Sequence, residues 1–338
     1  MGGHGSPYSL KMLSVLRYRR IPHLMISAMM RPPPGKPSAK VHLMPTFYLP
    51  AEGDDGGEIQ AIVDSTPLIR RFEREFEGRS ILPDDPVIAW LNDLLEDYGD
   101  EWMTKFMFHF RWAAQQDIEN AAEVLALHRD TTMHGEAAEA QMKAFAKRQI
   151  DRLYVVGSND ITRPLIEEGY RRFLRLFDTH LRAQPYLLGT RPASCDFAFY
   201  GQLTQLALFD PTPVQITHEE SPRTVAWVHA LSENSGFEPA DDGFIGRDQV
   251  PETLRALLSE VGRSYVPVML ANVEALASGA DTVECEVEGK VWSQKPFPYQ
   301  GKCVQSLRES YEALAPDDRK AVDAILAGTG CEQLVADR

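Results

Sequence analysis

The sequence predicts an α+β protein in which a small mixed region precedes a large helical one. Two observations lead to this expectation. Over residues 1–80, short apolar runs alternate with turns and with two amphipathic stretches. From Pro86 onward, long stretches carry apolar residues at helical spacing instead. We therefore expect one domain over 1–80, a helical domain over 86–235, and an additional mostly helical extension with a short hairpin over 236–338.

The N-terminal elements follow from apolar spacing and from proline. Leu10, Leu13 and Leu16 share one helical face, and Pro7 suits a first helical turn. Four prolines in 31–40 prevent either regular element there. The expected elements are a helix over 7–20, a buried strand over 22–30, a loop over 31–40, an apolar stretch over 41–49 that Pro45 interrupts, a turn over 51–58, a strand over 59–63 and a helix over 65–78.

The helical elements are longer and follow the same periodicity. The stretch over 195–209 is apolar along most of one side, which predicts the central helix of its domain. The turn signal Glu288-Gly289 predicts a hairpin over 282–292. The expected helices cover 86–114 (long or broken), 135–153, 162–184, 195–209, 222–234, 250–277, 301–314 and 316–328.

Composition limits the partners and the compartment. The net charge of −14 argues against binding to nucleic acid or to an anionic membrane surface. The sequence has neither an apolar run long enough for a membrane span nor a signal pattern at its start. Its four cysteines form no Cys-x-x-Cys pair, which indicates reduced thiols, no metal site and a cytoplasmic protein.

Ser6 is the first candidate for chemistry. A serine directly before a helix that begins with proline is an effective N-cap, and this structural role is the commoner one. The same position puts a hydroxyl at the positive end of the helix dipole, where an anion such as a thiolate is stabilised. Ser9, one turn later, is the second candidate for that role.

Two further motifs have both structural and binding interpretations. Pro45 lies inside an apparent strand, and spacing alone favours a trans Met44–Pro45 bond. If the bond is cis, the backbone of Met44 is open to an extended peptide. Asp64, Ser65 and Thr66 precede a helix, so they act as caps, or they bind a zwitterion through the helix N–H groups, Ser65 and the Asp64 carboxylate.

Together, "SPYSLKM", "LMPT", "DSTPLIRRFE" and "YLLGTRPASCDFAFYGQL" make residues 1–235 resemble serine-type, bacterial-like cytosolic glutathione transferases. The resemblance implies a thioredoxin-like glutathione-binding domain, an all-helical C-terminal domain and a homodimer. It implies that glutathione is a co-substrate whose thiolate attacks a small-molecule electrophile. A glutathione-dependent lyase or isomerase and a non-catalytic binding or scaffold protein are the alternatives.

The resemblance also assigns roles to residues. Ser6, or alternatively Ser9, would stabilise the thiolate, Met44 would bind the cysteinyl backbone and Pro45 would be cis. Asp64 and Ser65 would bind the γ-glutamyl end.

Two groups of side chains complete the implied site. The glycyl carboxylate has Lys36, Lys40 and His42 as candidates. The resemblance also implies that Trp102, Phe106, His109 and Trp112 line the second-substrate pocket, although core packing is the commoner role of such residues.

Three departures from the family pattern stand out. Only "MGGHG" is available for the strand that should precede the first helix, so we expect either a stunted strand or a true start that lies upstream. Ala193 stands where the family has a hydroxyl cap three residues before Asp196, and Ser194 is the expected substitute. The extension over 236–338 matches no pattern of the family.

Overall fold

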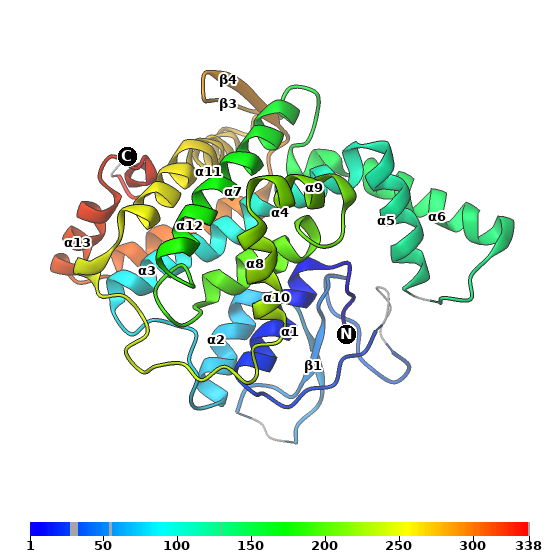
Figure 1. Cartoon of the computed structure of the whole chain (residues 1–338), viewed down its shortest axis with the longest axis horizontal. Coiled ribbons are helices and arrows are strands. Elements are labelled where there is room, and N and C mark those ends of the chain that lie inside the picture. The colour runs from blue at the N-terminus through cyan, green and yellow to red at the C-terminus, as the bar shows by residue number, and fades with distance from the viewer. Residues whose placement is uncertain (28–32, 54–55, 129, 337–338) are drawn as a thin grey trace.

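The computed structural model describes residues 1–27, 33–53, 56–128 and 130–336. Most of this chain is helical, and the strands among the described residues form two small antiparallel sheets, so the α+β class is confirmed (Figure 1). The strands are β1 Phe47–Leu49, β2 Gln60–Ile62, β3 Val283–Val287 and β4 Lys290–Gln294. The helices of the first half are α1 Pro7–Tyr18, α2 Ser65–Glu75, α3 Pro86–Asp97, α4 Met103–Ala113, α5 Gln115–Leu127, α6 Gly135–Ile150 and α7 Arg163–Ala183. The later helices are α8 Ser194–Leu206, α9 Pro211–Glu220, α10 Pro222–Ser232, α11 Glu252–Ser278, α12 Pro298–Glu312 and α13 Pro316–Leu326.

The sheet of the N-terminal region is smaller than the sequence predicts. β1 and β2 pair with Phe47 opposite Ile62, and the run over 41–49 forms a strand only after Pro45, which has no N–H to donate. The first residues lie beside this sheet: the Met1 amino group donates to Thr46 O at 2.6 Å, and Thr46 N donates to Met1 O at 2.8 Å. Met1 therefore makes two backbone hydrogen bonds to Thr46, but no strand precedes α1 among the described residues.

The expected buried strand over 22–30 is wrong for its described part, and residues 28–30 lie outside the described chain. Leu24 is 93% exposed, and Ser27 makes only a single bridge, to Gly2. The reason is the short partner: one glycine cannot support a ladder of several residues.

The Met44–Pro45 peptide bond is cis. The trans bond that spacing alone favoured is therefore wrong, and the cis bond implied by the family resemblance is confirmed.

The helical region follows the sequence prediction closely. The long stretch over 86–114 is one helical run broken by a π-helical turn, Tyr98–Trp102, between α3 and α4. All residues of α8 are buried, which confirms it as the central helix. Two helices, α5 and α9, were not expected, although α5 carries Ile118, Ala121, Ala122 and Leu125 at helical spacing.

The extension packs into the same hydrophobic core as the preceding helices. α11, α12 and α13 lie beside α3 and α7, whereas α5 and α6 project on the opposite side (Figure 1). Trp292 of β4 is fully buried with its ring 5.2 Å from that of Trp102, and Trp90 donates to Leu307 O at 3.1 Å. The extension therefore forms one body with the helical region.

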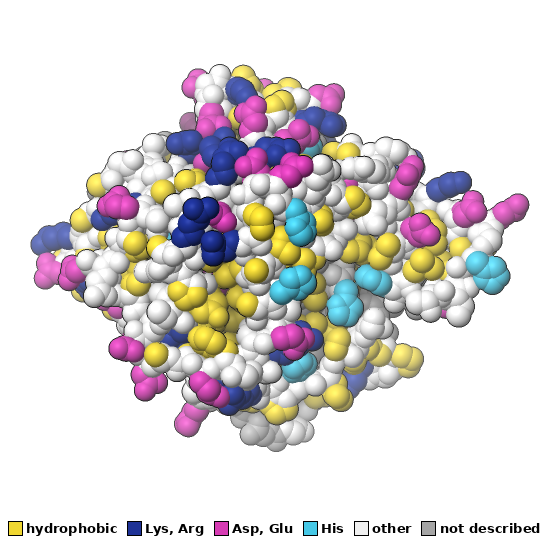
Figure 2. All heavy atoms as spheres, viewed as in Figure 1, with side chains coloured by type: hydrophobic (Ala, Val, Ile, Leu, Met, Phe, Trp, Pro, Cys, Tyr) yellow, Lys and Arg dark blue, Asp and Glu magenta, His cyan; other side chains and the backbone are white. Residues whose placement is uncertain are grey.

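The surface around the β3–β4 hairpin carries both charges. In the space-filling view, Lys and Arg side chains alternate there with Asp and Glu (Figure 2). Arg172 contacts Glu288 at 2.8 Å, and Lys290 contacts Glu168 at 2.9 Å. The cations of this part of the face are therefore paired.

The cap of α8 differs from the sequence prediction. Asp196 accepts hydrogen bonds from the backbone N–H groups of Ala193 and Leu187, both at 2.9 Å. Ser194 does not act as the substitute cap, because its hydroxyl bonds to Asn92 and Glu96 on α3. The Asp196 carboxylate therefore bonds the backbone at the start of α8 without a partner hydroxyl.

The position of α1 depends on a glycine of α8. A Cβ at Gly201 would lie 2.7 Å from Pro7 O and 3.0 Å from Lys11 Cβ. Because real side chains do not approach a backbone oxygen so closely, glycine is what lets the first turn of α1 lie against α8.

Candidate functional site

Ser6 lies at the mouth of α1 and has both of the features predicted for it. Its Oγ accepts a hydrogen bond from Ser9 N at 3.3 Å, so it is the N-cap of the helix. The same Oγ lies 3.5 Å from Met44 O, beside the cis peptide. Two motifs separated by 38 residues thus meet at one helix N-terminus.

The backbone before Ser6 is fixed by buried polar side chains. Arg111 Nη1 donates to Gly5 O at 2.8 Å, and Gln205 Nε2 donates to His4 O at 3.0 Å. Arg111 is in turn paired with the buried Asp210, at 2.9 Å. These contacts fix the backbone of the two residues before Ser6. They thereby restrict the position of the Ser6 hydroxyl, as a binding site requires.

A cavity of about 200 Å³, here called the Ser6 cavity, opens in front of this hydroxyl. Ser6 and Met44 line one side, and Trp112, Leu125 and Phe145 of α4, α5 and α6 form a mostly apolar wall on the other. Such a wall suits an uncharged, apolar molecule next to the α1 N-terminus.

A second cavity, of about 380 Å³ and here called the Asp64 cavity, lies at the N-terminus of α2. Its wall includes Asp64 and Thr66 from α2, Glu96 from α3, and Tyr299 and Cys303 from α12. If the β1–β2 register, with Phe47 opposite Ile62, is continued by two residues, Pro45 falls opposite Asp64. The cis peptide and the Asp64 motif therefore lie just beyond the same end of this strand pairing.

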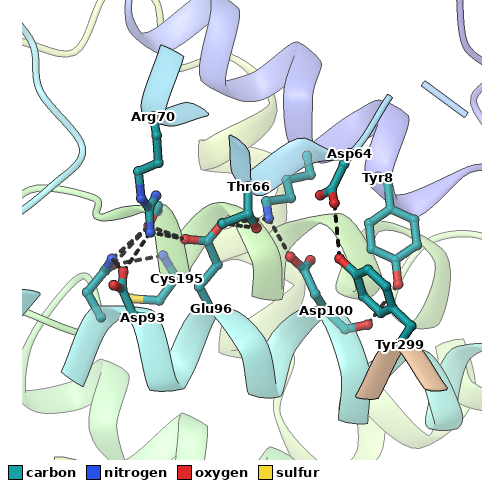
Figure 3. A network of polar contacts seen from close by, with 12 residues as sticks. Tyr8, Asp64, Thr66, Arg70, Asp93, Glu96, Asp100, Cys195 and Tyr299 are labelled. Atoms are coloured by element: carbon teal, nitrogen blue, oxygen red, sulfur yellow. Dashed lines mark hydrogen bonds and ion pairs between the residues drawn. The ribbon is translucent and has the colours of Figure 1, made fainter. Parts of the chain in front are cut away.

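A buried charge network supports this second cavity (Figure 3). Lys11 of α1 is fully buried between Glu96, at 2.9 Å, and Asp100, at 2.6 Å. Glu96 also accepts from Thr66 at 2.9 Å and from Arg70 at 3.1 Å. Burial opposes ionisation of Glu96, but Lys11 and Arg70 outweigh it and hold its pKa well below the usual range.

The π-helical turn adds carboxyl groups that behave differently. Burial raises the pKa of Asp100 to about 7, against the opposing effect of Lys11. Burial, together with the neighbouring Asp97 and Asp100, raises the pKa of Glu101 to about 8. Asp97, bonded to the Tyr265 hydroxyl, has its pKa raised to about 6, again by burial. Perturbed carboxyls and π-helical turns are both typical of functional sites, and of these three residues Asp97 of α3 lines the Asp64 cavity.

The structure brings part of the predicted set together. Ser6 and Met44 line the Ser6 cavity, and Asp64 lines the other one. Ser9 is buried, accepts a hydrogen bond from Gly3 N and lines neither of these two cavities, and Ser65 is also buried outside them. Ser6 is therefore the better placed of the two serines.

Of the four residues predicted to line the second-substrate pocket, only Trp112 lines the Ser6 cavity. Trp102 packs on Trp292 of the extension and Phe106 on Tyr170, so both belong to the core. His109 is buried, with Nδ1 2.7 Å from Ser158 Oγ and Nε2 3.3 Å from Glu167. For these three residues the core-packing alternative holds: the extension and α7 cover them.

The three candidates for the glycyl carboxylate lie apart from both cavities. Lys36, Lys40 and His42 are exposed on the proline-rich loop and its continuation, and Lys36 lies over the Tyr48 ring at 5.9 Å. None of the three lines the Ser6 cavity or the Asp64 cavity.

Sequence reasoning missed the charged groups and the contribution of the extension. The acidic residues of "LLEDYGDEW" stand within an apolar helix, and this pattern could have indicated buried carboxyls. Nothing around Tyr299 in "KPFPYQ" points to a site 235 residues earlier in the chain.

Comparisons with protein-family models, with curated proteins and with solved structures give no match to this chain. Within the described ranges, no set of His, Cys, Asp and Glu side chains is arranged to hold a metal ion. None of the helices there is both long and apolar enough to cross a membrane. The cysteines Cys195, Cys285, Cys303 and Cys331 are all free thiols.

Proposed function

We infer that the chain is a glutathione-dependent transferase in which Ser6 stabilises the glutathione thiolate. One observation carries this proposal: the Ser6 hydroxyl, the cis Met44–Pro45 peptide and the α1 N-terminus meet at a single cavity. A hydroxyl that donates to a thiolate, at the positive end of a helix dipole, favours the charged form of the thiol.

The proposal also assigns positions to the rest of glutathione and to the electrophile. The extended tripeptide would pair with the Met44 backbone and reach the Asp64 cavity with its γ-glutamyl end. The electrophile would lie against Trp112, Leu125 and Phe145. A homodimer and a cytoplasmic location belong to the same proposal.

The free thiol has a pKa of about 8.5, so it is mostly protonated at neutral pH. Lowering this pKa by about two units requires about 2.7 kcal/mol of preferential interaction with the thiolate. A charge-assisted hydrogen bond and a helix dipole together reach that magnitude. The proposed chemistry is therefore within the range of the groups present.

The first test is glutathione binding by calorimetry, followed by turnover with a generic aryl halide. The proposal predicts binding, and it predicts that Ser6→Ala lowers turnover on the order of 100-fold, the effect typical of removing one donor to a developing anion. Ser9→Ala is the matched control, because Ser9 lies on the same helix but outside the cavity. Loss of turnover in Ser9→Ala alone would transfer the role to Ser9.

A specific observation favours a second candidate, a non-catalytic binding or scaffold protein. The Ser6 cavity, at about 200 Å³, is smaller than the roughly 300–1,000 Å³ usual for a small-molecule pocket. Binding of glutathione without turnover of any electrophile would favour this candidate or a lyase or isomerase. Absence of glutathione binding would favour the scaffold and contradict the transferase.

A further inference from the structure

The extension lines one side of the Asp64 cavity with residues of α12, among them Tyr299, Lys302 and Cys303. Tyr299, near the start of α12, directs its hydroxyl at the Asp64 carboxylate, with Oη 3.1 Å from Oδ2 (Figure 3). The residue is 42% exposed as a whole and lines the cavity together with Asp64 and Thr66. The extension therefore supplies part of the wall at the α2 N-terminus.

The backbone next to Tyr299 is fixed by a buried amide. Asn272 of α11 is fully buried, accepts from Phe297 N at 2.7 Å and donates to Phe297 O at 3.0 Å. Gln300, the residue after Tyr299, is also buried. Phe297, two residues before the tyrosine, is thus held by Asn272, and Gln300, directly after it, is packed inside, which limits the positions open to the hydroxyl.

Asp64 is free to receive a ligand because it does not cap its own helix. It is the N-cap residue of α2 with a φ of 82°, and its side chain makes no capping bond. An ionised carboxylate offers about four lone-pair directions, and Tyr299 occupies one of them. The remaining directions are the natural partners of a primary ammonium group.

Tyr299 remains a donor under ordinary conditions. Burial raises the pKa of its hydroxyl, and the nearby carboxylates of Asp64 and Glu101 raise it further. The hydroxyl can therefore hold the carboxylate in place but cannot compete for its negative charge as a cation would.

We propose that Tyr299 is a positioning residue, supplied by the extension, which orients the Asp64 carboxylate to bind the free α-ammonium of the γ-glutamyl end. This inference rests on the proposed function, since it assumes that glutathione reaches the Asp64 cavity. It gives the extension a role in substrate choice: the site selects ligands with a free amino group at that end.

The experiment is a thermodynamic cycle on the full chain. Calorimetry measures the dissociation constants of glutathione and of an analogue that lacks the γ-glutamyl amino group, for the wild type, Tyr299→Phe and Tyr154→Phe. Tyr154→Phe is the matched control, because Tyr154 is 52% exposed and lines neither cavity. We expect Tyr299→Phe to weaken glutathione binding about 10-fold, the loss typical of a hydrogen bond to a charged group.

The analogue separates positioning from a general structural effect. We expect Tyr299→Phe to leave the dissociation constant of the analogue unchanged, and Tyr154→Phe to change neither. The double variant Tyr299→Phe/Asp64→Asn should bind glutathione no more weakly than Asp64→Asn alone, because the two residues act through one contact.

Three results would overturn the proposal. Equal losses for both ligands would mean that Tyr299 only supports the structure. Tighter glutathione binding in Tyr299→Phe would mean that the tyrosine obstructs the site. Absence of glutathione binding in the wild type would remove the proposed function as well, and this sets it apart from the first two results.

Discussion

The two cavities on either side of the α1 and α2 N-termini differ in what forms their walls. The Ser6 cavity is bounded by backbone, the Ser6 hydroxyl and apolar side chains of α4, α5 and α6, with His4, Arg111 and His128 as its basic residues. The Asp64 cavity is bounded by charged and hydroxyl groups from α2, α3 and α12. We infer from this difference that the two cavities contribute differently to stability and to binding. Changes at the Asp64 cavity should alter the free energy of unfolding and its pH dependence. Changes at the Ser6 cavity should mainly alter the affinity for the ligand.

The largest expected effect comes from Lys11 on the charged side. Lys11→Met leaves Glu96 and Asp100 buried without their shared cation, so we expect a loss of about 3–5 kcal/mol in the free energy of unfolding. Denaturant unfolding measures this loss. Lys143→Met, at an exposed pair with Glu139, should cost less than about 1 kcal/mol, and similar costs for the two variants would refute the division.

The second effect concerns pH and the π-helical turn. Because the pKa of Glu101 is raised to about 8 in the folded state, the folded protein binds more protons than the unfolded chain between about pH 5 and pH 8. Stability should therefore fall as pH rises through this window. Glu101→Gln should flatten the decline by an amount on the order of a few kcal/mol, whereas Glu119→Gln on α5 should not. An unchanged slope in Glu101→Gln would argue that this carboxyl titrates normally.

The third effect concerns the packing of α1 on α8, which positions residues at both cavities. Gly201→Ala places a Cβ 2.7 Å from Pro7 O, so α1 must move and we expect a loss of about 1–3 kcal/mol. Glutathione binding should weaken as well, because both Ser6 and Lys11 lie on or beside α1. Gly236→Ala is a suitable control, because no atom lies within 4 Å of a Cβ there. Unaltered stability in Gly201→Ala would show that α8 does not fix α1.

Much of the helical region was predictable because its elements carry their own signal. The apolar stripe of α7 and the largely apolar residues of α8 are both visible in the local sequence. The run over 22–30 was mistaken for a strand because a strand also needs a partner, and only one residue, Gly2, bridges to Ser27. Apolar character alone does not report whether such a partner exists.

The candidate site shows the same division. Ser6, Met44 and Asp64 could be found because each sits in a short motif at the end of an element. Tyr299 could not, because its role depends on the packing of α12 against the α2 N-terminus. For Trp102 and Phe106 the sequence left a pocket role and a core role open, because aromatic residues occur in both, and Trp102 packs on Trp292 in the core.

The central claim, that Ser6 stabilises a bound thiolate, is tested most directly by titrating the thiol of glutathione in its complex. The ultraviolet absorbance of the thiolate, followed against pH at saturating protein, gives its pKa. The account predicts a pKa about two units below that of free glutathione with the wild type, and a return toward the free value with Ser6→Ala. A bound thiol that titrates as it does in solution, or one equally shifted in Ser6→Ala, would contradict the claim.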